Sequence, residues 1–144
     1  MAGNIFQSEE DGEEMVSAIS RFALALYTEQ GKRQEGNLFM SPLSISAVLS
    51  MACLGARGNT LAEMRKSLCF DALKDDKLHQ AFSDVVLYLE KCSKEVNEDT
   101  LEPDTFQLQV ANRLFTEESN KILEDFQMVC MKYYGADTAA VSFK

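Results

Sequence analysis

Apolar side chains recur at three- and four-residue steps along much of the chain, which predicts amphipathic helices. The first such stretch covers residues 13–31, where acidic residues open the pattern and Gly31 closes it. Its predicted inward positions are Val16, Ile19, Phe22, Ala23 and Leu26. Residues 1–11 are mostly polar, and we expect them to fray or to dock loosely.

A second helix is predicted to begin at Ser41 and Pro42. Serine is a favourable N-cap, and proline is tolerated in the first helical position because its missing N–H would be unpaired there anyway. The following residues are apolar on almost every side as far as Gly55, so we expect this helix to be buried on most sides. Burial would require partners for its polar side chains, which are Ser44, Ser46 and Ser50.

Two weaker signals flank this helix. Residues 37–40 form an apolar run that is too short to assign alone. Beyond the turn at 55–59, Thr60 and Glu63 have the spacing of a capping box, in which each side chain bonds a free backbone N–H of the other residue. This spacing predicts a third, short helix that ends at Leu68.

The clearest amphipathic pattern lies at residues 78–94, with apolar side chains in steps of four and three. The pattern lasts for two heptads, which favours a helix lying on a domain over a coiled coil. The acidic stretch 96–104 contains Pro103 and is predicted to be an exposed loop.

The last third of the chain changes period. Apolar and polar residues nearly alternate over 105–116, which predicts a strand with one buried face. Ser119 and Asn120 are predicted to start a further helix, Gly135 to close it, and 137–143 to begin another strand. The predicted inward positions of that helix are Ile122, Leu123, Phe126, Val129, Cys130 and Tyr133. Because the elements do not alternate as in a parallel α/β fold, the order predicts an α+β protein.

Composition narrows the choice of partners. The chain has 144 residues, 46% of them hydrophobic, and carries a net charge of −9. It can therefore build a core, as one domain or as part of a larger one. The acidic balance argues against nucleic-acid and anionic-membrane partners. No transmembrane run and no signal peptide is recognisable, so we expect a cytoplasmic protein, with leaderless export as an alternative.

Catalytic and metal-binding patterns are weak. Four cysteines lie far apart in apolar helical patterns, and we expect buried, reduced thiols rather than a zinc site. The single histidine, His79, has polar sequence neighbours and is expected at the surface. The two glycines of 55–59 precede a helix but lack the lysine of a phosphate loop. We therefore expect no enzyme, no cofactor and no metal, and calcium-loop spacing is lacking as well.

Several segments together resemble the N-terminal signature of the serpins. The longest is NLFMSPLSISAVLSMACLGARGNTLAEMRKSLCF at 37–70, followed by QVANRLF at 109–115 and KYYGADTAAVSF at 132–143. ISRFALALY at 19–27 fits as well, and the order is conserved along nearly the whole chain. The acidic start without a leader is similar to the intracellular, ovalbumin-type branch.

The resemblance implies an assignment of each element. The implied elements are helix A at the start, a strand of sheet B at 37–40, helix B at 42–54, helix C at 61–68, helix D at 78–94, a central strand of sheet A at 105–116, helix E at 121–134 and the edge strand of sheet A at 136–143. Residues 1–144 would then be the N-terminal portion of a single serpin domain.

A serpin mechanism would follow from the resemblance. Serpins offer a reactive loop to a serine or cysteine protease, and the cleaved loop inserts into sheet A as a new strand and traps the acyl-enzyme. Phe39, Ser41, Ser44 and Asn112 match the shutter, where sheet A parts. For Ser41 the plain alternative is a helix cap, and both roles are compatible.

The reactive loop lies near the C-terminus of a serpin, so the resemblance implies that this chain ends before it. We therefore expect the chain alone not to inhibit proteases and to be a fragment or short form of an inhibitor. A non-inhibitory, chaperone-like serpin and a free-standing interaction module remain alternatives. Mixed charges around 78–94 give no case for heparin binding.

Overall fold

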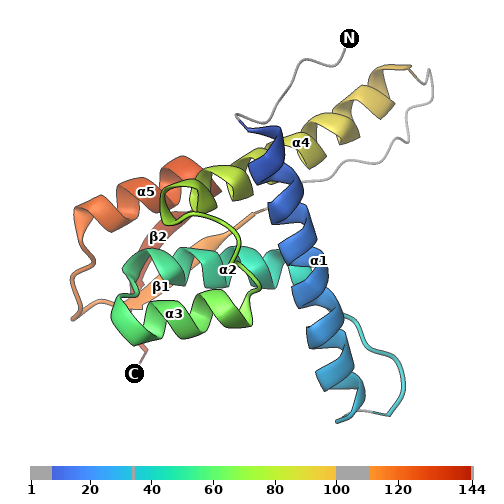
Figure 1. Ribbon diagram of the computed structural model, residues 1–144. Coiled ribbons are helices and arrows are strands. Elements are labelled where there is room, and N and C mark those ends of the chain that lie inside the picture. Colours follow the sequence, from blue (N-terminus) through green and yellow to red (C-terminus); the bar gives the residue numbers. More distant parts are fainter. Residues whose placement is uncertain (1–7, 34, 100–110, 144) are drawn as a thin grey trace.

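The computed structural model describes residues 8–33, 35–99 and 111–143, with the backbone alone for 93–99. The elements are α1 (Glu9–Gly31), α2 (Pro42–Gly55), α3 (Gly58–Ser67), α4 (Asp75–Asp99), β1 (Arg113–Glu117), α5 (Glu124–Tyr134) and β2 (Asp137–Val141). Four helices and a two-stranded sheet with its connecting helix give an α+β fold, as predicted. Figure 1 shows α1 running steeply across the direction of α2 and α4, both of which it contacts, with the sheet behind α2 and α5.

Helix α1 begins four residues before the predicted start at residue 13. Ser8 is the N-cap, and its side chain accepts a hydrogen bond from the backbone N–H of Asp11 at 3.3 Å. The acids in the first turn stabilise the positive end of the helix dipole. The predicted apolar stripe is confirmed in part, because Ile19 and Phe22 pack against the core. The fully buried positions are Met15 and Ala18, which were not predicted, and Val16 is 48% exposed.

Helix α2 begins where Ser41 and Pro42 predict it and ends at Gly55. The expectation of burial on most sides was too broad. Its fully buried face is Ser46, Ala47, Ser50, Met51 and Cys53. Val48 and Leu49 are exposed on the other side, since no described segment covers them.

Two predictions around α2 were wrong. Residues 37–40 are irregular, because no described strand pairs with them and a short apolar run does not hold a strand conformation alone. Helix α3 begins at Gly58 with Arg57 as its N-cap, and no side chain caps it. Thr60 and Glu63 lie inside the helix, so they do not form the predicted capping box.

Helix α4 contains the predicted 78–94 helix and extends it at both ends. Leu78, Phe82 and Val85 are buried at the predicted spacing. Residues 96–99 are helical rather than part of a loop, while 100–104 lie outside the described residues.

Strands β1 and β2 pair in parallel, with Arg113 opposite Asp137 and Glu117 opposite Val141. The two predicted strands are confirmed in position but are shorter, and residues 105–110 of the first lie outside the described part of the chain. The β1–α5–β2 segment is therefore a local parallel βαβ unit.

Helix α5 begins at Glu124 rather than at Ser119 and Asn120, which form a turn. Leu123 is consequently outside the helix and 77% exposed, contrary to its predicted inward position. The helix closes at Gly135, as predicted, and this residue adopts the left-handed conformation with φ 56°.

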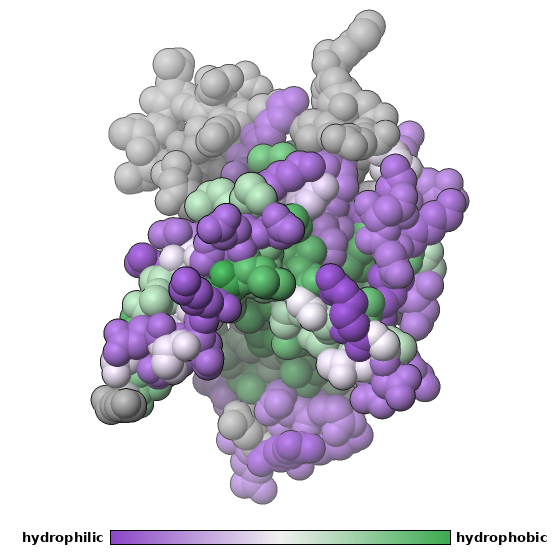
Figure 2. Space-filling model, turned by 90° about the vertical axis from the view of Figure 1, so that its left-hand side faces the viewer, coloured by the Kyte–Doolittle hydropathy of each residue, from purple (hydrophilic) through white to green (hydrophobic). Residues whose placement is uncertain are grey.

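One core joins the helices and the start of β2. It contains Met15, Ala18, Ala47, Met51, Cys53, Leu68, Phe70, Leu73, Leu78, Ala81, Phe82, Val85, Cys130, Tyr134 and Ala136. Large apolar side chains also remain exposed, among them Phe115 on β1 and Met128 and Met131 on α5. Figure 2 shows apolar side chains gathered in a hollow on one face, with polar side chains around it.

Candidate functional site

The N-terminal end of α2 carries three of the four predicted shutter residues. Ser41 Oγ accepts a hydrogen bond from the Ser44 backbone N–H at 3.3 Å and donates one to Ser44 Oγ at 3.0 Å. Both serines and Phe39 are exposed, and Phe39 fully so. Ser41 is thus the helix N-cap, and the paired hydroxyls face solvent in the described structure.

Asn112, the fourth predicted shutter residue, lies directly before β1 and is half-buried. Its side chain makes no hydrogen bond to any residue that the structure describes, Ser41 and Ser44 included. The structure therefore does not bring Asn112 together with the two serines.

The buried face of α2 holds two further hydroxyls, on Ser46 and Ser50. Neither makes a hydrogen bond of ordinary geometry with the described part of the chain. Ser50 lies near enough to the Tyr134 hydroxyl to oppose the rise in the pKa of that phenol. A buried hydroxyl without a partner costs about 1–3 kcal/mol, so the predicted need for partners is unmet here.

His79 is not the surface residue that its polar sequence neighbours predict. It is half-buried on α4, and its Nδ1 lies 2.6 Å from the hydroxyl of Tyr134 on α5. The pKa of His79 is lowered from 6.5 to about 4, chiefly by burial and also by the nearby Arg65 guanidinium, while Asp75 opposes this shift. Burial also disfavours the charged form of Tyr134 and therefore raises the pKa of that phenol. Both groups are therefore neutral at pH 7.

Aromatic rings surround this hydrogen bond. The Tyr134 ring packs against Phe82, with ring centroids 5.5 Å apart, and meets the His79 ring edge-on at 5.9 Å. Tyr133 lies 6.2 Å from His79 on the outer side. Sequence spacing did not reveal this pair, since 55 residues separate its two members. The signal that was present is the position of His79 directly after Leu78, at the edge of the apolar stripe.

Two arginines hold the connection between α3 and α4. The Arg65 guanidinium donates to the carbonyls of Phe70 and Leu73 and pairs with Asp75 at 2.8 Å. Arg21 on α1 donates to the Cys69 carbonyl at 3.1 Å and pairs with Glu14. These hydrogen bonds supply donors to backbone carbonyls that lie outside the helices, and they hold the 68–75 turn against the core.

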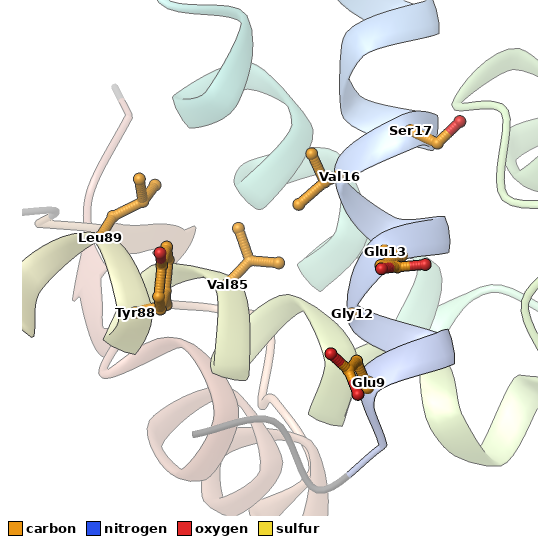
Figure 3. Close-up of a pocket in the computed structure, with 8 residues that line it drawn as sticks. All are labelled: Glu9, Gly12, Glu13, Val16, Ser17, Val85, Tyr88 and Leu89. Carbon is orange, nitrogen blue, oxygen red and sulfur yellow. The ribbon is translucent and has the colours of Figure 1, made fainter. Parts of the chain in front are cut away.

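A groove of about 540 Å³ lies between α1 and α4. Val16, Val85, Tyr88 and Leu89 form its apolar walls, and Glu9 and Glu13 lie along one rim (Figure 3). The titratable side chains that line the groove are the carboxylates of Glu9 and Glu13 and the phenol of Tyr88.

The four cysteines are free thiols. Cys53 and Cys130 are buried as expected, and burial raises the pKa of each. Cys69 and Cys92 are half-buried, and Cys69 lies in the turn after α3 with φ 61° rather than in a helix. Raised pKa values make Cys53 and Cys130 poor nucleophiles at neutral pH.

Among the described residues, no three metal-binding side chains of the His, Cys, Asp and Glu types gather in one place. None of the helices in the same ranges combines the length and apolar character that a bilayer crossing requires.

Comparison with known proteins gives one consistent result. The family model for the serpins, the serine protease inhibitors, matches residues 17–144. The chain is 39% identical to the leukocyte elastase inhibitor of Sus scrofa over 132 residues, which is 91% of this chain and 32% of that protein. Serpin B8 of Homo sapiens is 34% identical over the same length, again 32% of its own chain. The chain therefore spans about a third of the length of the curated relatives it matches.

Proposed function

The chain belongs to the serpin family, and from this premise we propose that residues 1–144 are the N-terminal portion of a single serpin domain. The main support for this proposal is the difference between the share of this chain and the share of each relative that the alignments cover. The relatives align with 91% of this chain, yet the alignment takes up 32% of their own length. The rest of a serpin domain would have to cover the surfaces that are bare here, such as Val48 and Phe115.

The proposed activity belongs to the whole protein. It is inhibition of a serine or cysteine protease, in which a cleaved reactive loop enters sheet A as a new strand. The relatives named leukocyte elastase inhibitor support a protease as the partner. Because the reactive loop of a serpin lies beyond the portion represented here, residues 1–144 alone would not inhibit.

We also propose a role for Ser41 and Ser44 at the shutter. Their hydroxyls are already joined to one another and are exposed, so they are free to bond a strand that packs over α2. Phe39 would be covered by the same strand, and Asn112 would complete the set from the sheet side. The exposed position of all three α2-side residues supports this role.

The other properties proposed for the protein follow from charge and composition. The net charge of −9 favours a partner other than nucleic acid, an anionic membrane or heparin. The protein would act as an inhibitor rather than an enzyme, without a cofactor, and in the cytoplasm as an ovalbumin-type serpin.

A chimera tests the proposal. Residues 1–144 would replace the matching third of the Sus scrofa leukocyte elastase inhibitor, and the product would be mixed with elastase. We expect a cooperative melt and a complex that survives detergent on a gel, whereas residues 1–144 alone give no such complex. A chimera that melts cooperatively without forming the complex would contradict the inhibitory proposal. A chimera that does not fold would contradict the assignment of residues 1–144 to a serpin domain.

A further inference from the structure

The contact between α4 and α5 depends on a titratable group. His79 Nδ1 and the Tyr134 hydroxyl lie 2.6 Å apart across this contact, and Tyr134 is 8% exposed. Phe82, fully buried, packs against the same tyrosine ring. The imidazole therefore lies where two helices meet, next to the apolar core rather than in water.

Helix α5 is the middle of the βαβ unit, so its position also sets that of β2. Only Gly135 and Ala136 separate Tyr134 from the first residue of β2, and Ala136 is buried. On its other side α5 contacts α2, where the Phe126 ring lies against Gly55. The contact of α5 with α4 responds directly to pH, because it contains the imidazole of His79.

An imidazolium at this position would lack a free counter-ion. Asp75, one helical turn before His79, is the carboxylate that attracts it. That carboxylate already pairs with Arg65 at 2.8 Å and is 78% exposed, so solvent and the guanidinium both weaken its pull. Arg65 itself repels a positive His79.

The remaining titratable and charged groups around the pair do not supply a counter-ion either. Cys53 on α2 and Cys130 on α5 are buried thiols whose pKa values are raised by burial. Arg57 lines the same small pocket as His79, and Lys132 lies over the outer Tyr133 ring. The groups that face the pair are Cys53, Arg57, Arg65, Asp75, Cys130, Lys132 and Tyr133.

We propose that His79 makes the docking of α5 on α4 sensitive to acid, so that protonation of its imidazole loosens α5 and the following strand β2 from the helical body. In the closed form, with α5 docked on α4, one hydrogen bond joins the neutral imidazole to the Tyr134 hydroxyl. In the opened form the imidazolium is hydrated, and its charge no longer lies beside Arg65 and the buried rings. This property rests on described residues alone and is independent of protease inhibition.

The size of the effect follows from proton linkage. His79 has a pKa of about 4 in the closed form and an ordinary value of 6.5 once it is hydrated. Between pH 7 and pH 5 the ratio of opened to closed α5 would then rise about twentyfold. Below pH 4 it would change little more, because both forms are protonated.

Direct titration is the first test, and it needs no variant. His79 is the only histidine in the sequence, so histidine labelled with carbon-13 and nitrogen-15 gives a single imidazole in the NMR spectrum. We expect a midpoint near 4 for the chain in buffer and near 6.5 in concentrated urea. A midpoint near 6.5 in buffer would overturn the proposal.

Hydrogen exchange is the second test, since it locates the opening. After correction for the intrinsic effect of pH on exchange, the protection of α5 and β2 amides should fall about twentyfold between pH 7 and pH 5. The protection of α1 should stay above that of α5 and β2 at pH 5, because α1 remains folded when α5 opens and exchanges through global unfolding. The variant H79Q keeps a polar side chain without a titration and should lose the fall in α5 protection, whereas D76N, at an exposed neighbour, should keep it.

Two exchange results would contradict the proposal. One is equal protection of α1 and α5 at pH 5, because that would mean global unfolding rather than release of α5. The other is the same fall in α5 protection in H79Q as in the parent chain, because His79 would then not be its cause. If H79Q were unfolded at pH 7, the NMR midpoint of the parent chain, together with the comparison of its α5 and α1 protection, would still decide the question.

Discussion

Arg65 and Asp75 form an ion pair of 2.8 Å across the turn that joins α3 to α4, and the arginine side chain is 14% exposed. The same guanidinium donates hydrogen bonds to the Phe70 and Leu73 carbonyls. The pair therefore does more than neutralise charge, because it satisfies two backbone acceptors in a segment that no helix covers. Phe70 and Leu73 contribute buried side chains to the core from this turn.

Replacing Arg65 with methionine should destabilise the chain. The substitution keeps most of the apolar stem but removes the Arg65 hydrogen bonds to the Phe70 and Leu73 carbonyls; the Phe70 carbonyl keeps its bond from the Leu73 N–H at 3.1 Å. We expect a loss of about 2–3 kcal/mol in the free energy of unfolding, measured by urea denaturation. The control is K66M, an exposed neighbour on the same helix, which should change it by under about 0.5 kcal/mol. Equal effects of the two variants would refute the role given to Arg65.

Replacing Tyr134 with phenylalanine should separate the hydrogen bond from the packing. The ring remains in the core, while His79 loses its partner. We expect a loss of about 1 kcal/mol in unfolding free energy. Y133F removes a hydroxyl that accepts a hydrogen bond from the exposed Lys132 and should have a smaller effect, within about 0.5 kcal/mol. A larger effect from Y133F would show that the outer tyrosine matters more.

The stability of the chain should fall as the pH falls below 6.5. The folded pKa of His79, about 4, lies below its ordinary value of 6.5, so folding favours the neutral ring. The stabilisation is therefore complete above 6.5 and is lost as the pH approaches 4. Between pH 7 and pH 5 we expect the unfolding free energy to drop by about 2 kcal/mol through His79. In H79Q this part of the drop should be absent. If H79Q showed the same pH profile as the parent chain, the drop could not be assigned to His79.

Ser41 and Thr60 should respond differently to alanine. Ser41 accepts the Ser44 N–H bond at the start of α2, so S41A should cost about 1 kcal/mol. Thr60 lies inside α3 without a capping bond, so T60A should change stability by under about 0.5 kcal/mol. Thermal unfolding of the two variants in parallel would measure this difference. A loss of stability in T60A as large as that in S41A would show that Thr60 caps α3 after all.

Ser46 is expected to be more stable as alanine. Its hydroxyl is buried without a hydrogen-bond partner in the described chain, so S46A removes a desolvated polar group and leaves little empty space. We expect a gain of up to about 1 kcal/mol in unfolding free energy. S67A, on the exposed face of α3, is the matched control and should be nearly neutral. A loss of stability in S46A would indicate that a partner satisfies this hydroxyl.

Local signals were sufficient for several elements. The cap at Ser41, the left-handed Gly135 and the spacing of Leu78, Phe82 and Val85 each depend on a few adjacent residues, and each was predictable. The start of α3 was not, because a plausible capping box at Thr60 competed with an earlier start that only the structure reveals.

Long-range contacts explain the larger errors. The neighbours of His79 in sequence are polar, and its burial is set by a tyrosine on another helix. Residues 37–40 lack a strand because pairing, and not the apolar run alone, makes a strand. The family resemblance placed the shutter residues in sequence, but in the described part of the chain no hydrogen bond joins Asn112 to Ser41.

The parallel pairing of β1 with β2 has a consequence for synthesis of the chain. Arg113 pairs with Asp137, so β1 emerges from the ribosome 24 residues ahead of the strand that will pair with it. At about 5–20 residues per second, this strand waits roughly one to five seconds with both edges open. During that interval its exposed Phe115 is available to chaperones or to other nascent chains.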